Sequence, residues 1–212
     1  MNTSAHAVLS LVVLGKQTDT RSNQVAIFCG AILPDAPMFV FYFIEKVVRG
    51  VDEAVIWSQK YYLNGWQNFF DLFNSLPIVA IVFVAGLALK VRNVVLLAAS
   101  MALHIAGDLP LHHDDGHRHF FPFSDWRFES PVSYWDPAHY GGVVGWFEAA
   151  LVIVGCVWLV ARYTSWFVRG LALFVLVAYG SYIGYALVVW IGLDWTEKTW
   201  SLQCACAPPD HQ

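Results

Sequence analysis

Histidine and aspartate side chains are concentrated between residues 103 and 142 of this chain. Six of the eight histidines lie there, together with five aspartates. They are His104, His112, His113, His117, His119, His139, Asp108, Asp114, Asp115, Asp125 and Asp136. Imidazole nitrogens and carboxylate oxygens are the ligands that zinc, iron, manganese and nickel take in proteins. The stretch therefore predicts a divalent-metal site, with a solvated polar loop as the simpler alternative.

His104 and Asp108 form the best-defined pair in this stretch. They are four residues apart at the end of an apolar run, so on a helix they project from one face, one turn apart. Pro110 then ends that helix. The loop that follows supplies further candidate ligands: His112, His113 and His117. Alternatively, Asp108 only satisfies the His104 ring as a structural hydrogen-bond partner.

Two candidate ligands lie nearer the N-terminus. Asp35 follows Pro34 inside an apolar run, and a charge at membrane depth is costly unless it has a partner. Because a proline breaks the local helix, Pro34 is expected to expose Asp35 to a cavity. The alternative is that Asp35 caps a helix that restarts at Pro37. His6 opens the first apolar run, where alone it would be an ordinary residue of a helix end.

We expect His6, Asp35, His104 and Asp108 to meet around one cation just outside the apolar layer. This requires His6 and Asp35 to lie within about 10 Å of His104, because even paired metal ions are only about 4 Å apart.

The composition indicates which class of protein must position these side chains. The 212 residues are 58% hydrophobic and 13% charged, against about 25% charged in an ordinary soluble domain. Too little polar surface remains to cover a water-soluble globule, and the many aromatic residues argue against a disordered chain. The net charge is −4 and no basic tract occurs, which argues against nucleic acid as a partner. The sequence predicts an all-α, polytopic membrane bundle with the lipid bilayer as its environment.

Five apolar stretches are long enough, or nearly so, to cross a bilayer as helices of about 20 residues. They are residues 25–44, 76–89, 93–107, 144–161 and 170–192. Lys90 and Arg92 separate the second stretch from the third and predict a tight basic turn between antiparallel spans. Residues 5–14 form either a sixth, short span or a helix packed among the others. The predicted bundle thus has five to six transmembrane helices.

With six spans, the connecting loops alternate between two sides of the membrane. One side takes the short basic loops 15–24, 90–92 and 162–169, and the other takes the His-rich loop. Short basic loops mark the cytoplasmic side. The His-rich loop is therefore expected on the extracytoplasmic side, and one span fewer would invert this orientation.

These residues also follow the order of a known pattern. The chain resembles a family of bacterial inner-membrane proteins classed as metal-dependent hydrolases, which includes a LexA-regulated member. The family pattern runs from an N-terminal His through a glycine-led Leu-Pro-Asp segment and H-x-x-x-D to P-F-S. The matching residues here are His6, residues 30–35, His104 with Asp108, and residues 122–124.

The resemblance implies a metal-binding hydrolase of the bacterial inner membrane. It is also remotely similar to zinc-dependent phospholipase C, which uses clustered zinc ions to hydrolyse phosphoesters. The implied metal is zinc, with manganese or iron as alternatives. Two departures put one ligand in question. Asn74 and Ser75 stand where the family has His-Ser, and His112 and His113 follow where it has a threonine.

These observations predict metal-assisted hydrolysis of a phosphoester or other ester at the membrane surface. A lipid-like substrate is expected, because a site at the ends of membrane helices meets headgroups first. The predicted metal ligands are His6, Asp35, His104, Asp108, His112, His113 and His117. Asp114 or Asp115 would orient the attacking water or act as general base. The alternatives are a non-catalytic metal carrier or sensor and an inactive hydrolase-like scaffold.

Residues 1–206 are expected to form one membrane-embedded domain with a His/Asp-rich loop at 108–142, followed by a flexible tail at 207–212. Cys29 and Cys156 lie in apolar runs and are expected to be buried thiols. Cys204 and Cys206 are only two thiols, too few to complete a tetrahedral zinc site.

Overall fold

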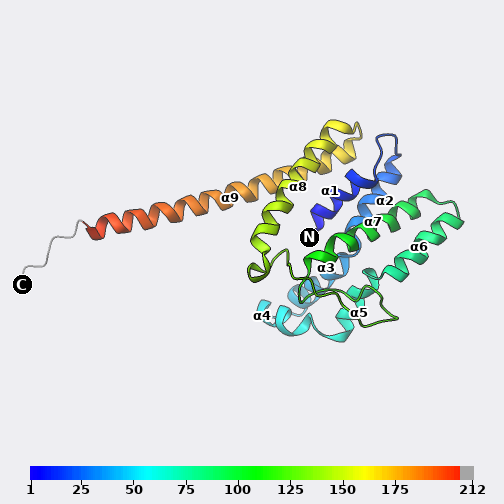
Figure 1. The fold of residues 1–212 in the computed structure, drawn as a ribbon, viewed down its shortest axis with the longest axis horizontal. Helices are drawn as coiled ribbons and strands as arrows, with labels where there is room; N and C mark the ends of the chain where they lie inside the picture. The colour runs from blue at the N-terminus through cyan, green and yellow to red at the C-terminus, as the bar shows by residue number, and fades with distance from the viewer. Residues whose placement is uncertain (206–212) are drawn as a thin grey trace, which may run out of the picture.

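The structure, a computed structural model, describes the backbone of residues 1–205 and the side chains of residues 1–189. Every regular element within residues 1–205 is helical, as predicted (Figure 1). The α-helices are α1 (Thr3–Leu14), α2 (Arg21–Ile32), α3 (Ala36–Tyr42), α4 (Glu53–Val55), α5 (Asn64–Phe73), α6 (Leu76–Ala88), α7 (Arg92–Asp108), α8 (Gly141–Arg162) and α9 (Trp166–Ala205). The π-helices are η1 (Phe43–Val48) and η2 (Ile56–Lys60), and the 3-10 turns are η3 (Leu109–Leu111) and η4 (Pro137–His139). The predicted tail and the side chains of Cys204 and Cys206 lie outside the described residues.

Four segments are long and apolar enough to cross a bilayer: Asn64–Ala88, Arg92–Leu111, Gly141–Arg162 and Trp166–Val189. The helices Arg21–Ile32 and Ala36–Val48 make a fifth span if the bent pair is counted as one, with a bend of 55° between them. The chain therefore has the helices of an integral membrane protein, four to five in number. The antiparallel pair α6 and α7, joined at Lys90, is present as predicted.

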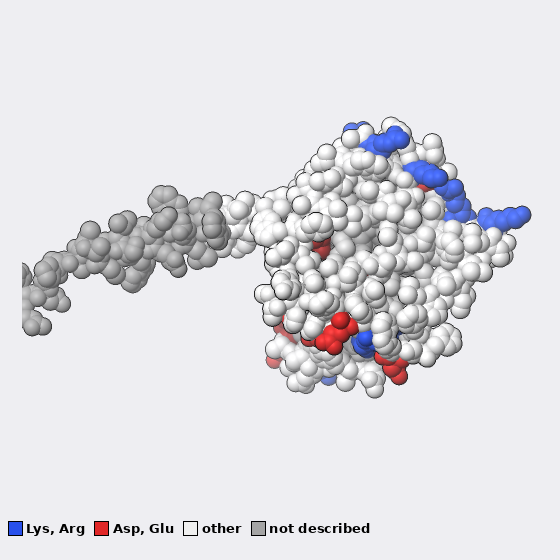
Figure 2. Space-filling view, viewed as in Figure 1, with Lys and Arg blue, Asp and Glu red and all other residues white. Residues whose placement is uncertain are grey.

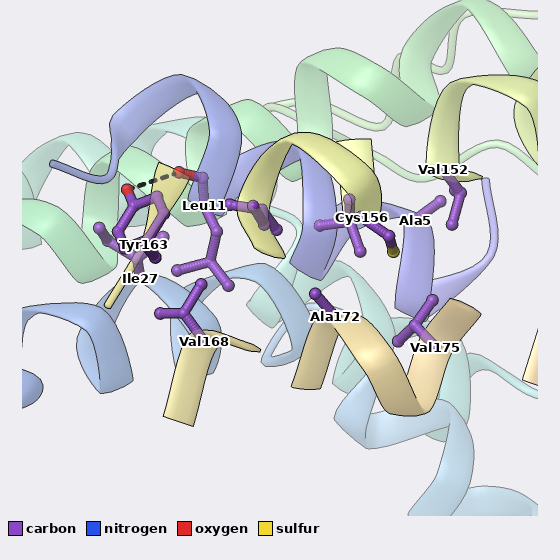
Figure 3. Close-up of a cluster of buried hydrophobic side chains, with 11 residues drawn as sticks. Ala5, Leu11, Ile27, Val152, Cys156, Tyr163, Val168, Ala172 and Val175 are labelled. Carbon is purple, nitrogen blue, oxygen red and sulfur yellow. Dashed lines mark hydrogen bonds between the residues drawn. The ribbon is translucent and has the colours of Figure 1, made fainter. Parts of the chain in front are cut away.

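The short helix α1 packs at the centre of the bundle. Its 12 residues rise about 18 Å, which is less than the roughly 30 Å of a bilayer's apolar core. Ala5, Val8 and Leu11 are fully buried in a cluster with side chains of α2, α8 and α9 (Figure 3). Near its C-terminal end, the Tyr163 hydroxyl donates to the Leu11 carbonyl over 3.3 Å. Of the two predicted alternatives, α1 is the helix packed among the others.

Three short turns meet at one end of the bundle. Arg92 of the α6–α7 turn donates to Asp19 of the α1–α2 turn over 2.8 Å, and Arg162 at the end of α8 donates to Gln17 over 2.7 Å. Figure 2 shows Lys and Arg side chains gathered at this end. The three short basic loops therefore share one side of the bundle, as the alternating topology predicts.

At the opposite end, the second half of the bent span (α3 and η1) and the first part of the span Asn64–Ala88 (α5) join α4, η2 and the loop 112–140 to form a cap (Figure 1). Phe41, Ile56, Tyr61 and Phe70 form the apolar core of the cap. The loop is fastened to α5 through Asp71, whose carboxylate accepts hydrogen bonds from the backbone and the guanidinium of Arg118. The cap thus closes over the end of the bundle where α1 begins and α7 ends.

Candidate metal centre

His6, His104 and Asp108 form a buried group whose ligand atoms all lie within 4.8 Å of one another. Asp108 is central: Oδ1 accepts from Nε2 of His6 over 2.9 Å, and Oδ2 lies 3.0 Å from Nε2 of His104. The two imidazole rings stack, with their centroids 3.7 Å apart. The amino group of Met1 also contacts Oδ1 of Asp108. The first turn of α1 and the last turn of α7 therefore supply this group together.

The break between α2 and α3 brings a fourth residue to the group. Helix α2 ends at Ile32 and α3 begins at Ala36, so Asp35 lies in the bend. Its Oδ1 lies 3.4 Å from Nε2 of His104, and its Oδ2 accepts from the Thr3 hydroxyl. Asp35 makes no capping hydrogen bond to α3. Asp35 therefore occupies the N-cap position of α3, as the alternative interpretation has it, but its carboxylate does not cap the helix and turns toward His104 instead.

The far side of the His104 ring determines which nitrogen faces the carboxylates. Nδ1 lies 2.6 Å from the carbonyl oxygen of Ala31, and because a carbonyl only accepts, Nδ1 carries the hydrogen. In the neutral ring, Nε2 then presents a lone pair to Asp108 and Asp35, and it has no aligned hydrogen-bond partner among the described residues. Such electron-rich atoms repel in a buried site unless a proton or a metal cation lies between them. The donor set fits a divalent metal, and the Ala31 carbonyl holds the ring as metal-bound histidines require.

His112, the first residue after η3, lies beside this group. Its Nε2 is 3.6 Å from Asp108 Oδ1, and its Nδ1 is 3.0 Å from Asp115 Oδ1 without the alignment of a hydrogen bond. Burial alone lowers the pKa of His112, but attraction by the Asp108 and Asp115 carboxylates raises it to about 9. The pKa of Asp115 is lowered, because the contact with His112 outweighs the effect of burial. In the absence of metal, the raised pKa of the partly buried His112 thus favours the imidazolium form between two carboxylates.

We expect the metal-free protein to lose stability as the pH rises between 6.5 and about 9. Since the pKa of His112 is higher in the folded state than in the unfolded state, its contribution is fully present below pH 6.5 and is lost as the pH passes about 9. The contribution is about 3 kcal/mol. Thermal unfolding of chelator-treated protein across this pH range measures it.

The matched variants for this pH series are His112→Gln and His139→Gln. His139 lies on the same loop and pairs with Asp136 rather than with Asp108. The His139→Gln variant is expected to keep the full decline in stability, and the His112→Gln variant to show a smaller decline. An unchanged decline in His112→Gln would contradict the assignment to His112.

A cavity of about 610 Å³ opens beside the group. Asp35, Asp108, His112, Asp115 and His117 line it, while His6 and His104 lie buried behind them. The residues of this site that the cavity exposes are therefore three carboxylates and two imidazoles.

The remaining predicted site residues differ in whether they line the cavity. Asp115 lines the cavity, but its neighbour Asp114 is exposed to solvent and does not line it. His113 donates to the Ser130 carbonyl over 2.6 Å and stacks on His139 with ring centroids 3.6 Å apart. Of the three loop histidines predicted as ligands, His112 and His117 thus face the cavity and His113 does not.

Asp71 and Glu148 are buried acids near this site that were not predicted as site residues. Asp71 is fully buried and lies 3.4 Å from Nδ1 of His117, so it backs a cavity-lining imidazole. Glu148 of α8 accepts from the backbone and side chain of Asn2 and from the Tyr179 hydroxyl, which holds the start of α1 in place. Glu148 is a lone acid within an apolar stretch, and that signal could have marked it, whereas the sequence around Asp71 carries no such signal.

Asn74, which stands where the resembled family has a histidine, has a structural role here. Its side-chain amide donates to the carbonyls of Pro34 and Phe70 over 3.2 and 3.1 Å. These bonds fasten the break after α2 to the end of α5. The Asn74 backbone carbonyl lies 3.2 Å from Nδ1 of His119, and burial lowers the pKa of that histidine.

No protein-family model, curated protein or solved structure matches the chain.

Proposed function

We propose that the protein is a membrane-embedded, metal-dependent hydrolase that acts on a phosphoester or other ester of a lipid-like molecule. One observation carries the proposal. A buried imidazole, His104, is oriented by the Ala31 carbonyl so that its free nitrogen faces two carboxylates, next to a cavity large enough for a small substrate. Zinc is the metal we propose, with manganese and iron as alternatives, since imidazole and carboxylate donors suit all three.

In this proposal the residues divide between holding the metal and moving protons. His6, Asp35, His104 and Asp108 would hold the metal, with His112 or His117 completing the set from the cavity side. A bound divalent metal would supply a Lewis acid that activates water and polarises the ester oxygen. Asp115 would accept the proton from that water, because it lines the cavity and Asp114 does not.

The proposed location is the bacterial inner membrane, with the metal group on the extracytoplasmic side. The short loops that carry Lys16, Lys90, Arg92 and Arg162 lie at the end of the bundle opposite the metal group. These loops share one side of the bundle whether or not α1 counts as a span, so the loss of that span does not invert the orientation. By the positive-inside rule that side is cytoplasmic. The choice of a bacterial membrane rests on the family resemblance.

Metal-dependent hydrolysis by purified protein tests the proposal. Metal per chain is measured first. The hydrolysis of bis-p-nitrophenyl phosphate and of p-nitrophenyl esters is then measured before chelation, after chelation, and after zinc, manganese or iron is restored. We expect activity that chelation removes and one of these metals restores. In the Asp115→Asn variant the rate should fall about 100-fold or more at unchanged metal content, while the neighbouring Asp114→Asn variant keeps it.

Stoichiometric metal without hydrolysis of any of these esters would contradict the enzyme and favour a non-catalytic metal-binding protein. Asn74 is consistent with that second candidate, since its amide bonds leave it a structural residue where the resembled family has a histidine.

A further inference from the structure

Residues 120–126 of the loop form an aromatic segment with exposed rings. The side chain of Phe123 is 78% exposed, and the exposed ring of Phe120 lies 5.8 Å from that of Trp126, centroid to centroid. None of these three rings lines the cavity beside the metal group. A contiguous exposed patch of large apolar side chains marks a surface that meets another molecule or a membrane.

The aromatic segment is fastened to the junction between α5 and α6. The backbone N–H of Leu76 donates to the His119 carbonyl over 2.8 Å, and the Ser75 hydroxyl donates to the Phe121 carbonyl over 2.6 Å. In Figure 1 the loop accordingly runs beside α5 where α6 begins. The depth of the segment in the membrane is therefore set by the level at which α6 starts.

Helix α6 is too short to cross the apolar layer by itself. Its 13 residues rise about 20 Å, against about 30 Å for the apolar core of a bilayer. Lys90 follows α6 and must lie at or outside the opposite boundary, because a charge within the layer is costly. The start of α6, and the segment fastened to it, therefore lie about 10 Å inside the layer on the side of the metal group. A tilt of the helix increases this depth.

The backbone of the aromatic segment is suited to this depth. The N–H groups of Phe121 and Phe123 donate to the carbonyls of Arg118 and Phe120, each over 2.9 Å. Pro122, between them, has no N–H to satisfy. Backbone polar groups within the apolar layer must find their partners inside the protein, and these groups do so.

The charged side chains next to the aromatic rings are paired and turn toward the membrane surface. Arg118 donates to the exposed Asp125 over 2.7 Å, and its guanidinium also donates to Asn68 of α5. Asn68 precedes α6 in the same span, so it lies nearer the membrane surface than the start of α6 does. Long basic side chains reach the interface in this way while their stems stay in an apolar surrounding.

We propose that the aromatic segment is a membrane anchor: Phe120 and Phe123 insert among the outer acyl chains of the leaflet on the side of the metal group. Trp126 then lies at the level of the headgroups, where tryptophan is favoured. The bilayer, rather than water or a second protein, covers this surface. Because the same loop carries His112 and His117, the anchor holds one wall of the cavity against the leaflet, whatever reaction the metal group catalyses.

Photo-crosslinking of the full chain in lipid nanodiscs tests the anchor. The variant is Phe123→p-benzoylphenylalanine, whose ketone bonds to neighbouring C–H groups on illumination, and mass spectrometry identifies the adducts. The control places the same residue at Asp114, which is exposed on the same loop near Tyr62. Tyr62 precedes a span of 25 residues that rises about 37 Å, so it lies beyond the apolar layer. We expect a phospholipid adduct at position 123 and none at position 114.

Oxidation by hydroxyl radicals in water gives a second measurement on the unaltered protein. In nanodiscs we expect Phe123 to be protected relative to Tyr62, although Tyr62 is the less exposed of the two in the protein itself, at 54%. Equal lipid adducts at positions 123 and 114, the absence of any lipid adduct at 123, or a crosslink from 123 to a second protein chain would overturn the inference. So would oxidation of Phe123 as fast as that of Tyr62.

Discussion

The His104→Ala variant is expected to bind no metal at concentrations that saturate the unaltered protein. The substitution removes the imidazole whose Nε2 lies 3.0 Å from Asp108 and 3.4 Å from Asp35, and it leaves those two carboxylates without a cation between them. Loss of a partner that only orients a metal ligand already costs about 10- to 100-fold in affinity. Loss of the ligand itself should exceed about 100-fold. Competition against a chromogenic chelator, with metal per chain measured by mass spectrometry, gives the affinity.

The His139→Ala variant is the control for this experiment. His139 belongs to the same histidine-rich stretch, but it is partly exposed and stacks on His113 away from the buried group. It should therefore keep full metal content. If the two variants bound metal equally well, the buried group would not be the metal site, and the surface histidines of the loop would account for any metal found.

The Gly30→Ala variant is expected to lower both the stability and the metal affinity of the protein. A Cβ atom at position 30 would lie 2.2 Å from the Leu97 carbonyl oxygen and 2.8 Å from Ser100 Cβ, so α2 would have to move away from α7. Overpacking of this kind costs about 1–3 kcal/mol. The next residue, Ala31, supplies the carbonyl that orients His104, so the same movement disturbs the metal group. Thermal unfolding and the chelator competition measure the two effects.

Gly170→Ala makes the same chemical change where there is room. A Cβ at position 170 meets no atom within 4 Å, and alanine favours an α-helix over glycine by up to about 1 kcal/mol. This variant should be as stable as the unaltered protein, or more so, with unchanged metal affinity. A Gly30→Ala protein that behaved like Gly170→Ala would show that the close approach of α2 to α7 does not control the site.

Local spacing was sufficient to predict part of the site. His104 and Asp108 are one helical turn apart, and a helix holds residues at that separation in contact whatever surrounds it. The break at Pro34 and the turn at Lys90 were likewise predictable, because proline removes a helical hydrogen bond and charges are costly within the bilayer. The membrane class followed from composition, since a chain with so little charge cannot cover a globule in water.

Only the tertiary structure decided which distant residues join that pair. His6 is 102 residues from Asp108 in the chain, and their contact depends on α1 packing at the centre of the bundle, where a 12-residue helix was equally consistent with a short span. The irregular loop has no period that fixes where its side chains point, so the sequence could not distinguish His112 from His113 or Asp115 from Asp114. Asp71 was missed for the same reason: its partners His117 and Arg118 reach it only when the loop folds back over α5. Contacts within one helix follow from its geometry, whereas contacts between segments follow from how the whole chain buries its apolar surface.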